Sequence, residues 1–157
     1  MHGATLAPMT LSFLQIAMVA AGLLFLRAMF SSFSDPTNGA LKLIDFTGVQ
    51  EILNAPSPEY VIIDVRERSE FRGGHIPNAV NMPFFASPGA LGLDEQEFEK
   101  KVGFKKPSLE QKLLFYCRSG TRSKRAAAKA FSYGYENVSN YPGSYQDWVS
   151  HGGRTEK

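Results

Sequence analysis

The sequence predicts an α/β fold: a three-layer sandwich with a mostly parallel sheet of about five strands and helices on both faces. Short apolar runs alternate along the chain with longer segments of helical composition. The clearest run, residues 60–65, is rich in β-branched residues, as strands buried on both faces are. Strands that alternate with helices at this spacing form parallel sheets, whose crossover helices cover both faces.

The first half of the expected domain contains three of these strands. Residues 41–44 form a short strand, and Asp45 then caps a helix that ends before two prolines. Residues 60–65 form a central strand, and the charged residues 66–72 form one or two helical turns that a glycine pair breaks. Residues 79–82 form a third, short strand.

The second half adds two strands and three helices. Residues 94–102 place acids before lysines, which suits the dipole of a helix. The apolar residues 113–116 form a buried strand, and an alanine-rich helix follows over residues 123–133. Residues 137–141 form the last strand. Ser144 begins the last helix, with an acid three positions on at the spacing of a capping box.

The only cysteine, Cys117, lies at the junction between strand 113–116 and the helix that follows. A helix N-terminus and nearby cations lower a cysteine pKa from about 8.5 towards roughly 3.5 to 7.5. From Cys117 to Lys129, the latter included, there are five cations and no acid. The amides of such a loop can form a nest that binds anions. Cys117 is therefore the expected nucleophile for an anionic substrate. Five residues are expected to bind that substrate: Arg118, Ser119, Gly120, Thr121 and Arg122.

Three separated stretches resemble the rhodanese family of single-domain sulfurtransferases, and among them the mitochondrial rhodanese-like proteins of lower eukaryotes. They are CRSGTR at residues 117–122, which fits the six-residue active loop of that family, VIIDVRERSEFRGGHIPNAVNMP at residues 61–83, and YPGSYQDWVSHGG at residues 141–153. The resemblance implies a thiosulfate sulfurtransferase without a cofactor or a metal. Cys117 would attack the sulfane sulfur of thiosulfate, release sulfite and hold a persulfide. Cyanide, glutathione, another small thiol or a protein thiol would then accept the sulfur.

The resemblance also implies roles for four charged residues. Arg118 and Arg122 are the expected partners of the thiosulfate sulfonate, because a fork of N–H donors suits its three oxygens. A second interpretation of Arg122 is that it folds back and braces the loop. Asp64 and Arg66 stand at the carboxyl end of a strand, where open α/β sheets place their sites. They are expected to support the loop as an ion pair and not to act in catalysis.

His75, Trp148 and one long loop are also informative. His75 lies in a G-H-I-P-x-A pattern that is structural in the rhodanese family, and Trp148 is expected in the core. Residues 84–93 form a long uncharged loop with two adjacent aromatics. This loop is either one wall of the substrate pocket or a core-packing segment.

Two other functions stay open. One is a persulfide carrier or docking module that receives sulfur from a protein donor. The other is a cysteine-dependent phosphatase or arsenate reductase, whose loop has five residues between the cysteine and an arginine. Here four residues separate Cys117 from Arg122. The shorter loop makes a cradle closer to the size of a sulfur atom, which favours sulfur transfer.

The composition excludes several classes of protein. A net charge of +2 over 157 residues is too small to indicate a nucleic-acid surface. One cysteine excludes an internal disulfide and indicates a reduced compartment, and the three histidines beside it lack metal-ligand spacing. Because no second thiol is present, the sulfur acceptor must come from another molecule.

The chain divides into four segments: an apolar targeting or tether segment at 1–30, a polar linker at 31–40, the rhodanese domain at 41–153 and a polar tail at 154–157. The candidate membrane tether runs from Leu11 to Phe30, and its uncharged part, residues 11–26, is shorter than the roughly 20 residues that span a bilayer. We expect a mitochondrial protein, with the tether in the inner membrane. The alternatives are a signal anchor in another membrane and an apolar tail packed on the domain.

Overall fold

The computed structural model describes residues 41–54 and 60–157. No helix in these two ranges is long and apolar enough to cross a bilayer. The targeting or tether segment expected at residues 1–30 and the linker expected at 31–40 lie outside the described residues.

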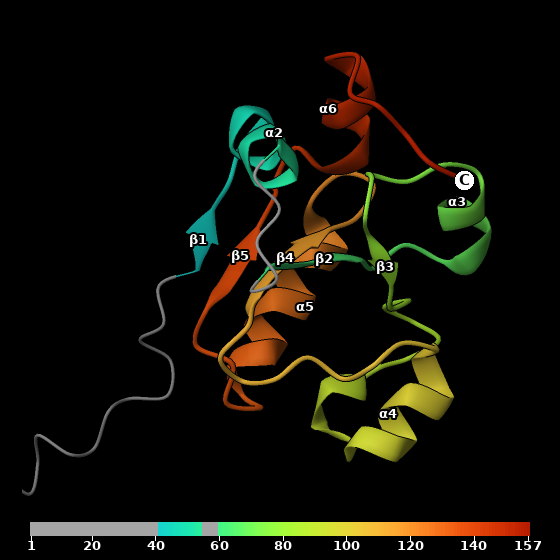
Figure 1. Ribbon diagram of the computed structural model, residues 1–157, viewed down its shortest axis with the longest axis vertical. Coiled ribbons are helices and arrows are strands. Elements are labelled where there is room, and N and C mark those ends of the chain that lie inside the picture. The colour runs from blue at the N-terminus through green and yellow to red at the C-terminus, as the bar shows by residue number, and fades with distance from the viewer. Residues whose placement is uncertain (1–40, 55–59) are drawn as a thin grey trace, which may run out of the picture. The chain divides into compact units, whose positions relative to one another are not determined.

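A five-stranded sheet forms the middle layer of the domain, with the strand order β1-β5-β4-β2-β3 (Figure 1). All of its strand pairs are parallel, which confirms the predicted fold class. Its strands are β1 (Lys42–Leu43), β2 (Tyr60–Asp64), β3 (Val80–Asn81), β4 (Lys112–Tyr116) and β5 (Val138–Asn140). β2 and β4 pair over their full length, so both end at the same edge of the sheet.

The side chains of the central strands alternate between two buried clusters, one on each face of the sheet. Leu113 and Phe115 of β4 belong to the cluster that α4 (Glu95–Val102) and α5 (Thr121–Phe131) cover. Leu114 belongs to the opposite cluster, which α2 (Phe46–Asn54) and α6 (Ser144–Ser150) cover. Helices on both faces explain why these strands are apolar throughout and do not alternate with polar residues.

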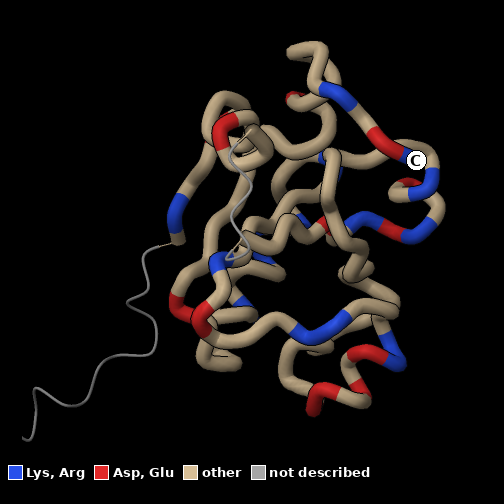
Figure 2. Tube along the Cα trace, viewed as in Figure 1, with Lys and Arg blue, Asp and Glu red and all other residues tan. Residues whose placement is uncertain are grey.

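Acidic residues cap two of the helices. Asp45 accepts a hydrogen bond from the amide of Gly48 at 2.9 Å before α2, as its position predicts. Asp94 accepts from the amide of Glu97 at 2.8 Å and caps α4. The charges of α4 run from acids in its first turn to lysines in its last, as the dipole favours. Figure 2 shows that acids and bases are interspersed along the described trace.

Several element boundaries differ from the expected ones. The strands expected at residues 79–82 and 137–141 are shorter, and the charged helix α3 spans Arg68–Arg72. The helix expected from Ser123 begins two residues earlier, at Thr121. The reason is Gly120, whose positive φ of 92° ends the loop and lets the helix start directly after it.

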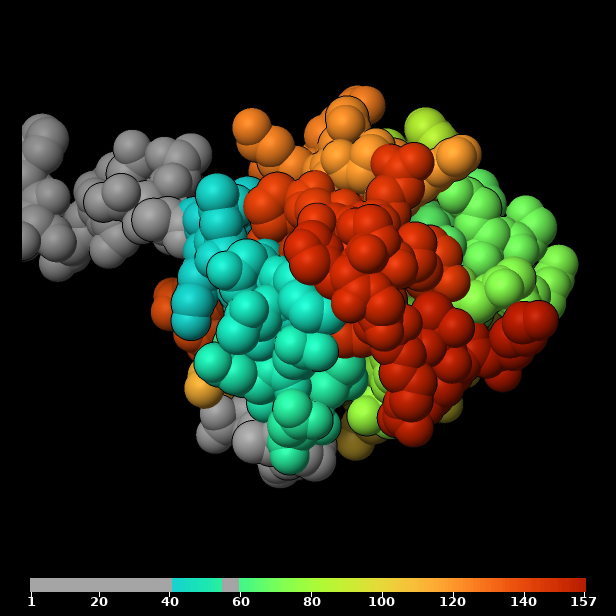
Figure 3. All heavy atoms as spheres, turned by 90° about the horizontal axis from the view of Figure 1, so that it is seen from above, coloured from blue at the N-terminus to red at the C-terminus, as the bar shows by residue number. Residues whose placement is uncertain are grey.

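Two of the last four residues, Arg154 and Glu156, contact the rest of the domain. Figure 3 shows α6 and the C-terminal residues between α2 and the green segment that carries α3. The main chains of His75 and Glu156 exchange two hydrogen bonds of 2.9 Å, and the carbonyl of Arg154 accepts from the indole of Trp148 at 2.8 Å. Trp148 is 2% exposed, so its predicted core position is confirmed.

Candidate active site

Cys117 lies directly after β4, at the carboxyl end of a central strand of the parallel sheet. This is where open α/β sheets place their sites. The side chain is 1% exposed. The amide of Gly120 donates a hydrogen bond to the Sγ of Cys117 at 3.1 Å. The loop therefore curls back over the sulfur, so that main-chain amides face it.

These amides change the ionisation of the thiol. Burial raises the pKa of Cys117, but hydrogen bonds from the side chain and amide of Ser123 and from the amides of Ser119 and Gly120 outweigh burial. The net pKa of Cys117 lies below its ordinary value. Donors that stabilise the charged form produce such a shift. These donors thus shift the ionisation of Cys117 towards the thiolate.

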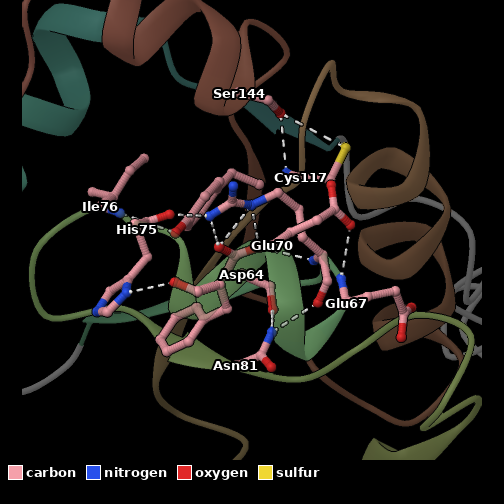
Figure 4. Close-up of polar contacts among 12 residues, drawn as sticks. Asp64, Glu67, Glu70, His75, Ile76, Asn81, Cys117 and Ser144 are labelled. Carbon is pink, nitrogen blue, oxygen red and sulfur yellow. Dashed lines mark hydrogen bonds and ion pairs between the residues drawn. The ribbon is translucent and has the colours of Figure 1, made fainter. Parts of the chain in front are cut away.

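Ser144, which comes from a distant segment, contacts both the amide and the sulfur of Cys117 (Figure 4). The amide of Cys117 donates to the Oγ of Ser144 at 3.1 Å, and this Oγ donates to the carbonyl of Tyr141 at 2.9 Å. The Oγ lies 3.9 Å from the Sγ of Cys117. The capping box expected at Ser144 is wrong, because the hydroxyl is used by the active loop and does not cap α6.

The start of α6 fixes the loop through its main chain as well. The carbonyls of Cys117 and Arg118 each accept a hydrogen bond of 3.0 Å, from the amides of Tyr145 and Gln146. A Cβ on Gly120 would lie 2.3 Å from the carbonyl oxygen of Pro142. Only glycine permits this approach. The segment around Ser144 is therefore a wall of the site, which reasoning from the sequence did not identify.

We expect Ser144→Ala to lower the free energy of unfolding by about 1–3 kcal/mol, because the buried amide of Cys117 loses its acceptor. Chemical denaturation of the full chain measures this value. The matched control is Ser150→Ala on the same helix, which removes an exposed hydrogen bond and should cost about 0.5 kcal/mol or less. Equal losses in the two variants would mean that the Ser144 hydroxyl has no special role.

Arg122 is paired in the structure with an acid that the sequence did not single out. Its guanidinium forms a fork on the carboxylate of Glu70, with distances of 2.8 and 3.1 Å. The hydrogen bonds from Arg122 keep the pKa of Glu70 below its ordinary value. This is the bracing arrangement considered as the second interpretation of Arg122. Its role in binding substrate remains a prediction.

The other expected loop residues lie at the surface around the sulfur. Arg118, Ser119 and Thr121 are exposed, and Gly120 is half-buried. No hydrogen bond or ion pair is made by the side chain of Arg118 to another described residue. Within residues 41–54 and 60–157, no group of three or more His, Cys, Asp or Glu side chains could hold a metal ion.

Asp64 and Arg66 form the ion pair that their position predicted. Both side chains are buried, and the Nη2 of Arg66 lies 2.6 Å from an oxygen of Asp64. The same nitrogen donates to the carbonyl of Gly74 at 2.7 Å, and the guanidinium lies 3.9 Å from the ring centre of Tyr145. Figure 4 labels Asp64 of this network in the same view as Cys117. The pair thus links the end of β2 to the loop before β3 and to α6.

His75 makes structural contacts, as the sequence predicted. Its Nδ1 lies 3.1 Å from the carbonyl of Phe71, and the two rings stack with centres 3.8 Å apart. The imidazole is almost fully buried. Nothing in these contacts directs His75 at the sulfur of Cys117.

The loop expected at residues 84–93 lines a cavity of about 640 Å³ and also packs into the core. Phe84 and Phe85 stand on its rim with Phe85 67% exposed, while Ala90 and Leu91 of the short helix η1 (Ala90–Gly92) are buried. The opposite wall is α5. The core-packing interpretation is therefore confirmed for Ala90 and Leu91. That the loop forms a wall of the substrate pocket stays a prediction.

Comparison with known proteins identifies a matching family and several relatives of the chain. The model of the family described as "Rhodanese-like domain" matches residues 47–151. A thiosulfate:glutathione sulfurtransferase of Saccharomyces cerevisiae is 47% identical over 108 residues, which are 69% of this chain and 78% of that protein. The mitochondrial thiosulfate sulfurtransferase RDL2 of the same yeast is 40% identical over 121 residues, 77% of this chain and 81% of that one.

The solved structures agree with the sequence relatives. The crystal structure of the yeast single-domain sulfurtransferase RDL2 superposes with a TM-score of 0.70 at 40% identity, over 74% of this chain and 94% of that one. The human single-domain sulfurtransferase TSTD1 superposes with a TM-score of 0.63 at 30% identity, over 71% and 97% of the two chains. With its active loop, its parallel sheet and these matches, the chain belongs to the rhodanese-like domain family.

Proposed function

We propose that the protein is a thiosulfate sulfurtransferase that carries sulfur as a persulfide on Cys117. The geometry at the sulfur supports this proposal most directly. The thiol is buried, it faces the amides of its own loop, and its pKa is lowered. The yeast relatives are named as thiosulfate sulfurtransferases, which supports thiosulfate as the donor.

The first half of the reaction is a displacement at sulfur. The thiolate of Cys117 forms a bond with the sulfane sulfur of thiosulfate, the S–S bond of thiosulfate breaks, and sulfite leaves with the electron pair. The terminal sulfur of the new persulfide carries the negative charge. Amides aimed at that charge stabilise it as an oxyanion hole stabilises oxygen.

The exposed cation Arg118 is the proposed partner of the thiosulfate sulfonate. Arg122 would contribute in two ways, since its fork on Glu70 fixes the helix start and its positive charge remains near the loop. Ser119, Gly120 and Thr121 complete the substrate-binding loop, while Asp64 and Arg66 support it from below. No cofactor takes part in this scheme.

The second half returns the enzyme to its starting state. A thiophile such as cyanide or a thiolate attacks the outer sulfur, the persulfide S–S bond breaks, and its electron pair returns to Cys117. Because one product leaves before the second substrate reacts, ping-pong kinetics are expected. Steady-state rates with thiosulfate and cyanide should give parallel double-reciprocal lines. Converging lines, or hydrolysis of an aryl phosphate that Cys117→Ser abolishes, would refute the proposal.

Because the pKa of Cys117 is lowered, the first half-reaction should keep its full rate to a lower pH than it would with an ordinary thiol. The rate of sulfite release follows the thiolate fraction, so it stays constant above the pKa of folded Cys117 and falls as the pH drops through it. We expect Ser123→Ala to move this fall to higher pH, because the substitution removes the side-chain hydrogen bond that lowers the pKa of the thiol, while the amide of residue 123 remains. Stopped-flow rates from pH 4 to 10 measure the shift. An unchanged profile would show that Ser123 does not act on the thiolate.

We also propose a mitochondrial location, which the mitochondrial yeast relative supports. The proposed membrane tether from Leu11 to Phe30 lies outside the described residues. Fusing residues 1–40 to a fluorescent protein tests both ideas, and diffuse cytosolic fluorescence would refute them.

A further inference from the structure

Glu70 brings a fixed negative charge to the active loop. Its carboxylate accepts two hydrogen bonds from the guanidinium of Arg122, at 2.8 and 3.1 Å. Arg122 is the last residue of the loop CRSGTR, which begins at Cys117. The amide of Glu67 also donates to the Glu70 carboxylate, at 3.0 Å, within a capping box at the start of α3 (Figure 4). Contacts from two separate segments therefore keep this carboxylate in place.

The sheet explains why an acid of α3 lies beside the active loop. β2 and β4 are parallel neighbours, and Asp64 pairs with Tyr116 at the point where both strands end. The segment that carries Glu70 follows β2, and the active loop follows β4, so both leave the sheet at the same edge. The ion pair between Glu70 and Arg122 therefore joins the connections that follow two adjacent strands.

This pair changes the positive charge that an anionic substrate meets. The hydrogen bonds of the fork lower the pKa of Glu70 and raise that of Arg122, so both groups are ionised at neutral pH. The charge of Cys117 also raises the pKa of Arg122, so the guanidinium and the sulfur interact electrostatically. Together the guanidinium and the carboxylate carry no net charge. Of the two arginines in the loop, Arg118 is the one without an ion pair to another described residue.

We propose that Glu70 sets the charge selectivity of the sulfur-donor site by cancelling the charge of Arg122. The inference rests on the proposed function, because it concerns the donor of that same reaction. With Arg122 paired, the site prefers doubly charged donors such as thiosulfate less strongly than it would with two free arginines. Singly charged sulfane donors, such as organic thiosulfonates, are the class that this arrangement favours. Glu70 acts through Arg122 and is a positioning residue.

Methanethiosulfonate is a donor that isolates this effect. A methyl group replaces one oxygen of thiosulfate, so the two anions have similar shapes, but methanethiosulfonate carries one negative charge and thiosulfate carries two. The thiolate of Cys117 forms a bond with the sulfane sulfur of either anion, and the S–S bond of the donor breaks. The electron pair of that bond leaves with sulfite in one case and with methanesulfinate in the other. The two reactions therefore differ chiefly in the charge of the leaving group.

The experiment measures kcat/KM of the full chain for each donor, with cyanide as the acceptor and thiocyanate as the product. The readout is kcat/KM for thiosulfate divided by kcat/KM for methanethiosulfonate. We expect Glu70→Gln to raise this ratio about threefold, because a dianion gains twice as much as a monoanion from the same uncancelled cation. Glu70→Asp keeps the negative charge and should leave the ratio within about 1.5-fold of the wild type.

The matched control is Glu136→Gln, which changes the net charge of the chain by the same amount. Glu136 is exposed and stands just before β5, at the edge of the parallel sheet opposite to the active loop. This variant should leave the ratio unchanged. Because the side chains of Arg122 and Glu70 are 21% and 31% exposed, their ion pair contributes little to stability, and the Glu70 variants should fold.

Arg122 provides the opposite change. Arg122→Gln leaves the carboxylate of Glu70 without its cation, so the ratio should fall about threefold. The double variant Glu70→Gln, Arg122→Gln removes both charges and leaves the net charge of the pair at zero. Its ratio should return to within about 1.5-fold of the wild type, although its individual rates are lower.

A purely bracing role of Glu70 gives a different result. Glu70→Gln would then lower both values of kcat/KM by the same factor, and a ratio that moves by less than about 1.5-fold would refute the proposal. An equal rise in Glu70→Asp or in Glu136→Gln would refute it too, since neither change uncovers the charge of Arg122. If the wild type forms thiocyanate from neither donor, the proposed function itself fails. Turnover of both donors with an unchanged ratio refutes only the role of Glu70.

Discussion

Cys117→Ser should lower the rate of sulfite release from thiosulfate by roughly 10³-fold or more. A serine hydroxyl remains protonated at neutral pH, so the nucleophile is lost while the shape of the site is kept. The chain contains no second thiol that could replace it. Single-turnover assays with thiosulfate in excess measure the rate without dependence on any acceptor.

The control for this variant is its stability. The substitution exchanges one buried atom, and the amide of Gly120 keeps an acceptor in the serine oxygen. We expect the free energy of unfolding to change by less than about 1.5 kcal/mol. If the folded variant kept activity within tenfold of the wild type, Cys117 would not be the nucleophile.

The second large effect concerns stability. Asp64→Ala should lower the free energy of unfolding by about 3–5 kcal/mol, because it leaves the guanidinium of Arg66 buried without its counter-charge. Arg66 is 3% exposed and Asp64 is 0% exposed, so water cannot replace the lost partner. Urea denaturation monitored by the fluorescence of Trp148 measures the change.

Removing both charges together provides the comparison. The double variant Asp64→Leu, Arg66→Met should be more stable than Asp64→Ala alone, because no unpaired charge remains in the interior. A double variant less stable than Asp64→Ala would mean that the contacts of Arg66 with Gly74 and Tyr145 matter more than its charge. A loss below about 1 kcal/mol in Asp64→Ala would contradict the role given to the pair.

The layers of the fold could be predicted because apolar runs in the sequence show which strands are buried on both faces. The apolar runs that become β2 and β4 lack polar alternation, and each face of the sheet carries helices. The position of Cys117 was predictable for the same reason, since β4 ends where the apolar run ends. Asp64 and Arg66 are close in sequence, so their pairing also followed from local reasoning.

The partners of the loop were not predictable because they come from distant segments. Ser144 is 27 residues from Cys117, and Glu70 is 52 residues from Arg122. The sequence around Ser144 has the spacing of a capping box, which misled the interpretation of its hydroxyl. Its φ of 57° places it in the left-handed region, and residue type alone did not reveal this. The contact of Glu156 with His75 likewise joins segments that local patterns do not connect.

Cys117 alone is expected to carry the transferred sulfur, as a persulfide. Mass spectrometry of the full chain tests it before thiosulfate, after thiosulfate and after subsequent cyanide. We predict a gain of one sulfur atom on the peptide that contains Cys117, and the loss of that sulfur with cyanide. A peptide that stays unmodified after thiosulfate, while its thiol still reacts with an alkylating reagent, would contradict the account.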